Sequence, residues 1–145
     1  MITSLNKFKG ISKTEKILFI KAYFYCFISR LIILFIPVKR YSSMLGMQNT
    51  ESNISILAEH ERIANLVKIA IWRVNKYAFW KNNCFAQASG AKQILSKLNI
   101  SSTLYLGVKK DANNQLIAHA WLRCGSNIIT GKKGYKQFTV VSTFA

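Results

Sequence analysis

Acidic residues are scarce in this 145-residue chain, which has five Asp plus Glu against 21 Lys plus Arg. Only two of the five acids, Glu59 and Glu61, are close together in the sequence. Calcium and magnesium cages, paired-carboxylate glycosidases and two-metal nucleases all need clustered carboxylates. The composition therefore argues against each of these chemistries.

Cysteine and histidine are also few. The three cysteines, Cys26, Cys84 and Cys124, are odd in number and widely spaced, which does not fit a disulfide framework. The chain has no Cys-x-x-Cys motif, and its two histidines have no paired spacing, so no zinc site is predicted. We expect reduced thiols, a cytoplasmic location, and neither a metal nor another cofactor.

The formal net charge of +16 favours polyanionic partners such as nucleic acid, anionic lipid or an acidic protein. The cations are spread along the chain and cluster only as pairs, for example Lys39-Arg40 and Lys132-Lys133. No run of five or more marks a basic arm. A solvated basic surface is therefore favoured over dedicated binding of nucleic acid.

The N-terminal part contains a long apolar stretch, residues 17–38, interrupted by Lys21 and Arg30. Neither uninterrupted piece reaches the roughly 20 residues that a membrane span requires. Ser12 and Glu15 resemble a capping box and Pro37 is a stop signal, so the pattern predicts one helix from about Lys13 to Ile36. Its wide apolar face favours packing against the domain or a partner protein, with peripheral membrane contact as the alternative.

The remaining periodicity predicts helices followed by strands. Apolar residues recur at helical spacing over residues 54–77 and 84–98, and residues 39–55 are polar and are interpreted as a linker. Strands are predicted at residues 104–108, 116–123, 128–130 and 138–141, joined as an antiparallel meander. We expect one compact α+β domain, with the hydrophobic helix and linker in residues 1–55 and the core in residues 56–145.

Two residues in this scheme are candidates for catalysis. Cys84 is predicted at the start of a helix, where the dipole favours the thiolate and free backbone N–H groups could hold an oxyanion. His119 is predicted in the middle of a strand, between Ala118 and Ala120. A thiol paired with an imidazole is the arrangement of papain-like and transglutaminase-like enzymes. The alternative is an inert core cysteine and a structural histidine.

Three segments carry a more specific resemblance: Trp80-Lys-Asn-Asn-Cys84-Phe-Ala-Gln87-Ala88, Leu104-Tyr-Leu-Gly107-Val108 and Ala118-His119-Ala120-Trp121-Leu122. Together they resemble the leader peptidase of lasso-peptide biosynthesis, which is a transglutaminase-like (papain-like) cysteine peptidase. The N-terminal helix ending in Ile-Pro-Val-Lys-Arg is also similar to that of the family, so the resemblance covers nearly the whole chain.

The resemblance implies an enzyme that removes the leader from a ribosomally made precursor, with Cys84 as nucleophile and His119 as general base and acid. It also implies three partners: the leader peptide, a separate leader-recognition protein and the ATP-dependent lasso cyclase that closes the ring. The chain resembles the stand-alone peptidase form, and the expected location is cytoplasmic or peripheral to the inner membrane face.

The sequence departs from the pattern of a Cys-His-Asp triad because no acid follows Asp111. The remaining orienters for His119 are a neutral side chain, Asn127 or Thr130, or a backbone carbonyl. Three further residues are candidates for the surroundings of the site: Gln87 for the oxyanion, and Trp80 and Trp121 for the substrate groove. Packing roles are the alternative for all three.

Two other functions stay open at this level. A non-catalytic basic module could bind an acidic protein, lipid or nucleic acid, and its binding would be salt-sensitive and indifferent to Cys84. The same fold could also transfer an amide to an acceptor other than water.

Overall fold

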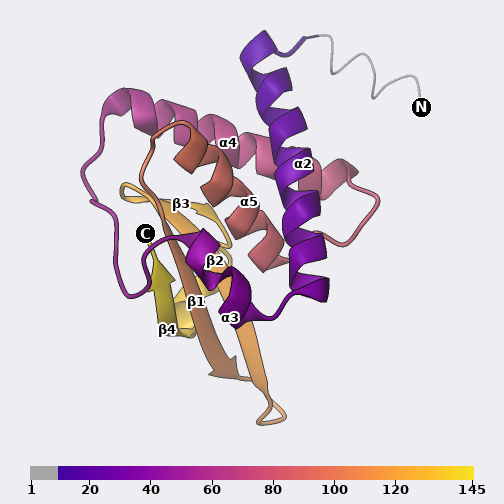
Figure 1. Ribbon diagram of the computed structural model, residues 1–145, viewed down its shortest axis with the longest axis vertical. Coiled ribbons are helices and arrows are strands. Elements are labelled where there is room, and N and C mark those ends of the chain that lie inside the picture. Colours follow the sequence, from indigo (N-terminus) through magenta and orange to yellow (C-terminus); the bar gives the residue numbers. More distant parts are fainter. Residues whose placement is uncertain (1–9) are drawn as a thin grey trace.

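The computed structural model describes residues 10–145 and consists of a helical layer packed on one face of a four-stranded sheet (Figure 1). The helices come first in the chain: α2 (Lys13–Phe35), α3 (Val38–Tyr41), the 3-10 helix η1 (Ser42–Leu45), α4 (Ala58–Tyr77) and α5 (Cys84–Lys97). The strands follow: β1 (Thr103–Lys110), β2 (Leu116–Cys124), β3 (Asn127–Thr130) and β4 (Thr139–Phe144), with the 3-10 helix η2 (Tyr135–Gln137) before β4. The predicted α+β class is confirmed.

Helix α2 begins and ends where the sequence signals predict. The Ser12 side chain accepts a hydrogen bond from the Glu15 backbone, and the Glu15 carboxylate accepts one from the Ser12 backbone, which completes the capping box. The helix ends at Phe35, because Ile36 is already extended and precedes Pro37. The predicted start of α4 at residue 54 is wrong, since the first helical residue is Ala58.

Helix α5 is the centre of the core, because it packs against α2 and α4 on one side and against the strands on the other. Eight of its residues are buried, and most of these are small: Ala86, Ala88, Ser89, Gly90, Ala91, Lys92, Ile94 and Leu95. The small side chains allow α2 to approach closely. A Cβ on Gly90 would lie 2.9 Å from Cys26 Sγ and 3.1 Å from the Cys26 backbone nitrogen.

The sheet has the order β3-β2-β1-β4, and all its pairings are antiparallel. The predicted meander is therefore wrong in its last connection, because β4 pairs with β1 instead of β3. The chain crosses from one edge of the sheet to the other through residues 131–138. Phe138 and Trp121 pack over Gly107 in the middle of β1, where no side chain stands between them and the strand.

The segment interpreted as a linker, residues 39–55, contains most of α3 and all of η1 and is packed along the domain. Tyr41 and Leu45 are buried, and Met47 and Ala145 exchange two backbone hydrogen bonds. Further along the segment, Glu51 accepts hydrogen bonds from Tyr105 and Arg123 on the sheet. These contacts join the N-terminal helices to both β1 and β2.

We predict that Gly90→Val lowers the free energy of unfolding by about 1–3 kcal/mol, because the added side chain would push α2 away from α5. Ser96→Val is the matched control. Ser96 is exposed on the same helix, and its substitution alters only helix propensity, which amounts to less than about 1 kcal/mol. Urea denaturation of the three proteins measures the difference. Equal stability of the two variants would contradict the close packing of α2 on α5.

Candidate active site

Cys84 is the first residue of α5, as the sequence predicts. Asn83 caps the helix: its side-chain oxygen accepts a hydrogen bond from the Ala86 backbone N–H at 2.9 Å, and its carbonyl accepts one from Gln87 N–H at 3.1 Å. The backbone N–H groups of Cys84 and Phe85 have no hydrogen-bond partner within residues 10–145. Two donors and the positive end of the helix therefore lie beside the thiol, as an oxyanion site requires.

The three cysteines differ sharply in their surroundings. Cys26 and Cys124 are fully buried in the core, whereas Cys84 is partly exposed. Burial raises the pKa of the Cys26 thiol to about 12, and it also raises the pKa of Cys124. Because the thiolate is the nucleophilic form, only Cys84 is suited to attack a substrate.

His119 lies in β2 opposite Gly107 of β1, and it alternates with core residues along the strand. Ala120 and Leu122 belong to the buried core, whereas His119 and Trp121 point to the other side of the strand. On β2, the residues that pair with β3 are Leu122 to Cys124. His119 is therefore at a part of β2 that β3 does not cover.

The ring of His119 is held by a backbone carbonyl. His119 Nε2 is 2.8 Å from the Gly131 oxygen, just after β3. A carbonyl oxygen can only accept, so Nε2 must carry the hydrogen and donate it. In the neutral ring Nδ1 is then unprotonated and available as a base. A backbone carbonyl was one of the orienters that the sequence left open, and the geometry favours it.

Gly131 is needed for this contact. Its φ is +70°, in the left-handed region, and a Cβ there would lie 2.4 Å from the Ala120 oxygen and 2.7 Å from Trp121 Cβ. A side chain at position 131 would push the backbone there away from β2, and the carbonyl that meets His119 would move with it. The sequence predicts strands at residues 128–130 and 138–141, which leaves Gly131 in the connection between them. Its role was missed because a glycine in a connection does not indicate which carbonyl meets the histidine.

Aromatic rings surround His119 on two sides. Phe138 lies 4.9 Å from it and Trp121 lies 5.9 Å from it, both measured between ring centroids. Trp121 is only 4% exposed, and it stacks on Tyr105 and contacts Tyr135. Trp121 is therefore packed beside the histidine and does not form an open groove wall. Phe138, which the sequence did not suggest, is the second ring that restricts the imidazole.

The other predicted site residues are engaged elsewhere. Asn127 donates to Glu61 Oε1 at 2.7 Å and makes no recorded contact with His119 within residues 10–145. Gln87 donates its side-chain amide to the Asn82 carbonyl at 2.7 Å, which braces the loop before Cys84. Trp80 packs edge-on against Tyr23 and Phe27 of α2.

Thr130, the other neutral candidate, is buried, and its hydroxyl has no hydrogen-bond partner among the described residues. No hydrogen bond joins Cys84 Sγ to the His119 ring in residues 10–145. Cys84 begins α5, which packs on β2, whereas His119 points to the side of β2 opposite Ala120 and Leu122 of the core. The two side chains therefore do not meet in this conformation, and proton transfer between them requires a rearrangement when substrate binds.

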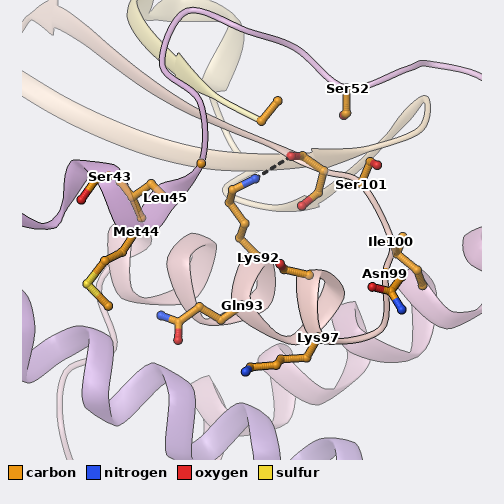
Figure 2. Close-up of a pocket in the computed structure, with 14 residues that line it drawn as sticks. Ser43, Met44, Leu45, Ser52, Lys92, Gln93, Lys97, Asn99, Ile100 and Ser101 are labelled. Atoms are coloured by element: carbon orange, nitrogen blue, oxygen red, sulfur yellow. Dashed lines mark hydrogen bonds between the residues drawn. The ribbon is translucent and has the colours of Figure 1, made fainter.

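A separate cavity of about 710 Å³ lies at the other end of α5 (Figure 2). Neither Cys84 nor His119 lines it. Lys92 reaches into its wall and donates to the Ser102 carbonyl at 2.7 Å, and burial lowers the pKa of this lysine to about 8. The cavity is therefore distinct from the candidate catalytic pair.

In a comparison with protein families, residues 33–143 match the transglutaminase-like superfamily. The chain belongs to this superfamily. The matched range includes α5, β1, β2, β3 and all but the last residue of β4, and hence both Cys84 and His119. No curated protein and no solved structure matches the chain. The transglutaminase-like superfamily includes cysteine peptidases and transferases, which agrees with the chemistry of a helix-start thiol.

We predict that iodoacetamide alkylates Cys84 in the native protein, because it is the one thiol among residues 10–145 that is not fully buried. Cys26 and Cys124 should react only after unfolding. Mass spectrometry of peptides from protein labelled with and without urea measures both rates. Labelling of Cys124 or Cys26 as fast as Cys84 under native conditions would contradict this assignment.

Proposed function

We propose that this transglutaminase-like protein is a cysteine peptidase that removes the leader peptide from a ribosomally synthesised lasso-peptide precursor. The observation that carries the peptidase part is the partly exposed Cys84 thiol at the capped start of α5. The imidazole proposed to act with it is His119 on β2, which the Gly131 carbonyl holds. The lasso-peptide part rests on the sequence resemblance in the segments around Cys84, Gly107 and His119.

The proposed reaction passes through an acyl-enzyme. His119 Nδ1 takes the proton from Cys84 Sγ, and the sulfur attacks the carbonyl carbon of the scissile peptide bond. Backbone N–H groups of Cys84 and Phe85 donate to the resulting oxyanion. The protonated imidazole then gives its proton to the leaving amine, and a thioester remains on Cys84. Water, deprotonated by His119, hydrolyses the thioester and frees the thiol.

The Gly131 carbonyl orients His119 as the carboxylate does in a Cys-His-Asp triad. It accepts from Nε2–H, so it orients the ring and directs Nδ1 away from β3. A neutral carbonyl stabilises the imidazolium less than a carboxylate does. This arrangement is consistent with a chain that has no acid after Asp111.

The proposed partners are the precursor's leader, a separate leader-recognition protein and the ATP-dependent cyclase. Their common location is the cytoplasm, where the precursor is made. The resemblance supports these partners, and the net charge of +16 is suited to docking on acidic surfaces of any of them.

We expect Cys84→Ala and His119→Ala each to reduce leader cleavage to the uncatalysed background, because each removes one partner of the same proton transfer. His60→Ala is the matched control, since His60 is in the first turn of α4 and should leave cleavage unchanged. The assay is mass spectrometry of the precursor incubated with this protein and the recognition protein.

The variants also separate the proposal from its alternative. Cleavage that survives Cys84→Ala would overturn catalysis by this thiol. Absence of cleavage by the unmodified protein, together with salt-sensitive binding of an acidic partner that Cys84→Ala does not change, would favour the non-catalytic basic module.

A further inference from the structure

Helix α2 has an outward apolar face that no other part of residues 10–145 covers. Ile20 is 66% exposed, Phe24 57% and Phe35 79%, and Ile17 and Leu34 are also exposed. At 3.6 residues per turn these side chains lie on one side of the helix, opposite the buried Leu18, Ala22, Cys26 and Ser29. The face is continuous along the helix, since the half-buried Phe27 and Leu31 fall on the same side.

Phe79 extends this surface beyond the helix. It is 84% exposed and contacts Trp80, which in turn packs against Tyr23 and Phe27 of α2. The transglutaminase-like match begins only at residue 33, so most of the apolar face precedes the matched part of the chain.

The charges around the apolar face have one sign. Lys13 and Lys16 are in the first turn of α2, and Lys21 and Arg30 fall on opposite borders of the face at helical spacing. The one acid of α2, Glu15, is turned to α4, where its carboxylate is 2.9 Å from Arg73. An apolar strip bordered by cations is complementary to an anionic bilayer surface.

The same helix has the length and composition of a membrane span, with a mean hydropathy of 1.9 in its most apolar stretch. However, the opposite side of α2 packs on α4 and α5, and the close contact of Cys26 with Gly90 ties it to the core. A helix that remains in this domain can insert only its outer face. The packing of α2 on the domain therefore allows the helix to lie in the membrane–water interface but not to span the membrane.

We infer that the α2 face formed by Ile17, Ile20, Phe24, Leu34 and Phe35 docks on the surface of an anionic phospholipid membrane. The apolar side chains enter the boundary between headgroups and acyl chains, and Lys13, Lys16, Lys21 and Arg30 contact the lipid phosphates. This docking does not depend on the proposed peptidase activity.

The test is co-sedimentation with vesicles of phosphatidylcholine mixed with phosphatidylglycerol, compared with phosphatidylcholine alone, over a range of NaCl concentrations. We expect binding to the anionic vesicles that weakens as salt rises. The double variant Ile20→Glu with Phe24→Glu should bind at least about tenfold more weakly. Its control, Leu116→Glu with Val141→Glu, changes two exposed apolar residues of the sheet and should bind like the unmodified protein.

A second variant keeps the test independent of folding defects. Lys13→Gln, Lys16→Gln and Lys21→Gln together leave the apolar packing intact and should weaken binding by roughly fivefold for each charge removed. Circular dichroism melts check that all variants fold.

Three results would overturn the inference. They are absence of binding by the unmodified protein, equal binding to neutral vesicles at all salt concentrations, and a dimer in sedimentation equilibrium that Ile20→Glu with Phe24→Glu dissociates. The last result would assign the face to a second copy of the chain.

Discussion

The close approach of α2 to α5 is the contact on which the rest of the domain depends. It places Gly90 against the backbone of Cys26, so that α5 is enclosed by α2 and α4 on one side and by the sheet on the other. Because α5 is enclosed, its first residue is fixed relative to β2. The position of Cys84 thus depends on a contact at Gly90, six residues further along α5, or about 9 Å at 1.5 Å per residue.

The second constraint is the shortage of acids, which shapes the candidate site. Three of the five acids form ion pairs with arginines: Glu15 with Arg73, Glu51 with Arg123 and Glu59 with Arg62. The role of orienting His119 is then left to a neutral group, the Gly131 carbonyl. The same shortage leaves α2 with a single acid, Glu15, which pairs with Arg73 of α4, and the cations bordering the α2 face suit an anionic surface.

Much of the fold could be predicted from the sequence because its signals are local. The Ser12–Glu15 capping box, the stop at Pro37 and the period-two pattern around His119 each depend on neighbouring residues, and they gave α2 and β2 with small errors at the ends. The crossing from β3 to β4 could not be predicted in this way. It depends on Phe138 and Trp121 packing over Gly107, which are contacts between residues far apart in the sequence.

The sequence predicted only part of the candidate site, because some of its features depend on contacts between residues far apart in the chain. Cys84 at a helix start follows from helix signals, and its partial exposure sets it apart from the two buried cysteines. The residue that holds His119 did not follow, because a backbone carbonyl has no sequence signature. Asn127 matched the expected chemistry of an orienter, yet its side chain is directed to Glu61, a partner from α4 that no spacing rule indicates.

The Gly131 carbonyl holds His119 in the Nε2–H form, which leaves Nδ1 free to act as a base in the proposed reaction. Nitrogen-15 NMR of the histidine side chains tests this directly, because the two ring nitrogens have different shifts when only one is protonated. We predict the shifts of a His119 ring that carries its hydrogen at Nε2, with Nδ1 bare. A ring protonated at Nδ1 would contradict it.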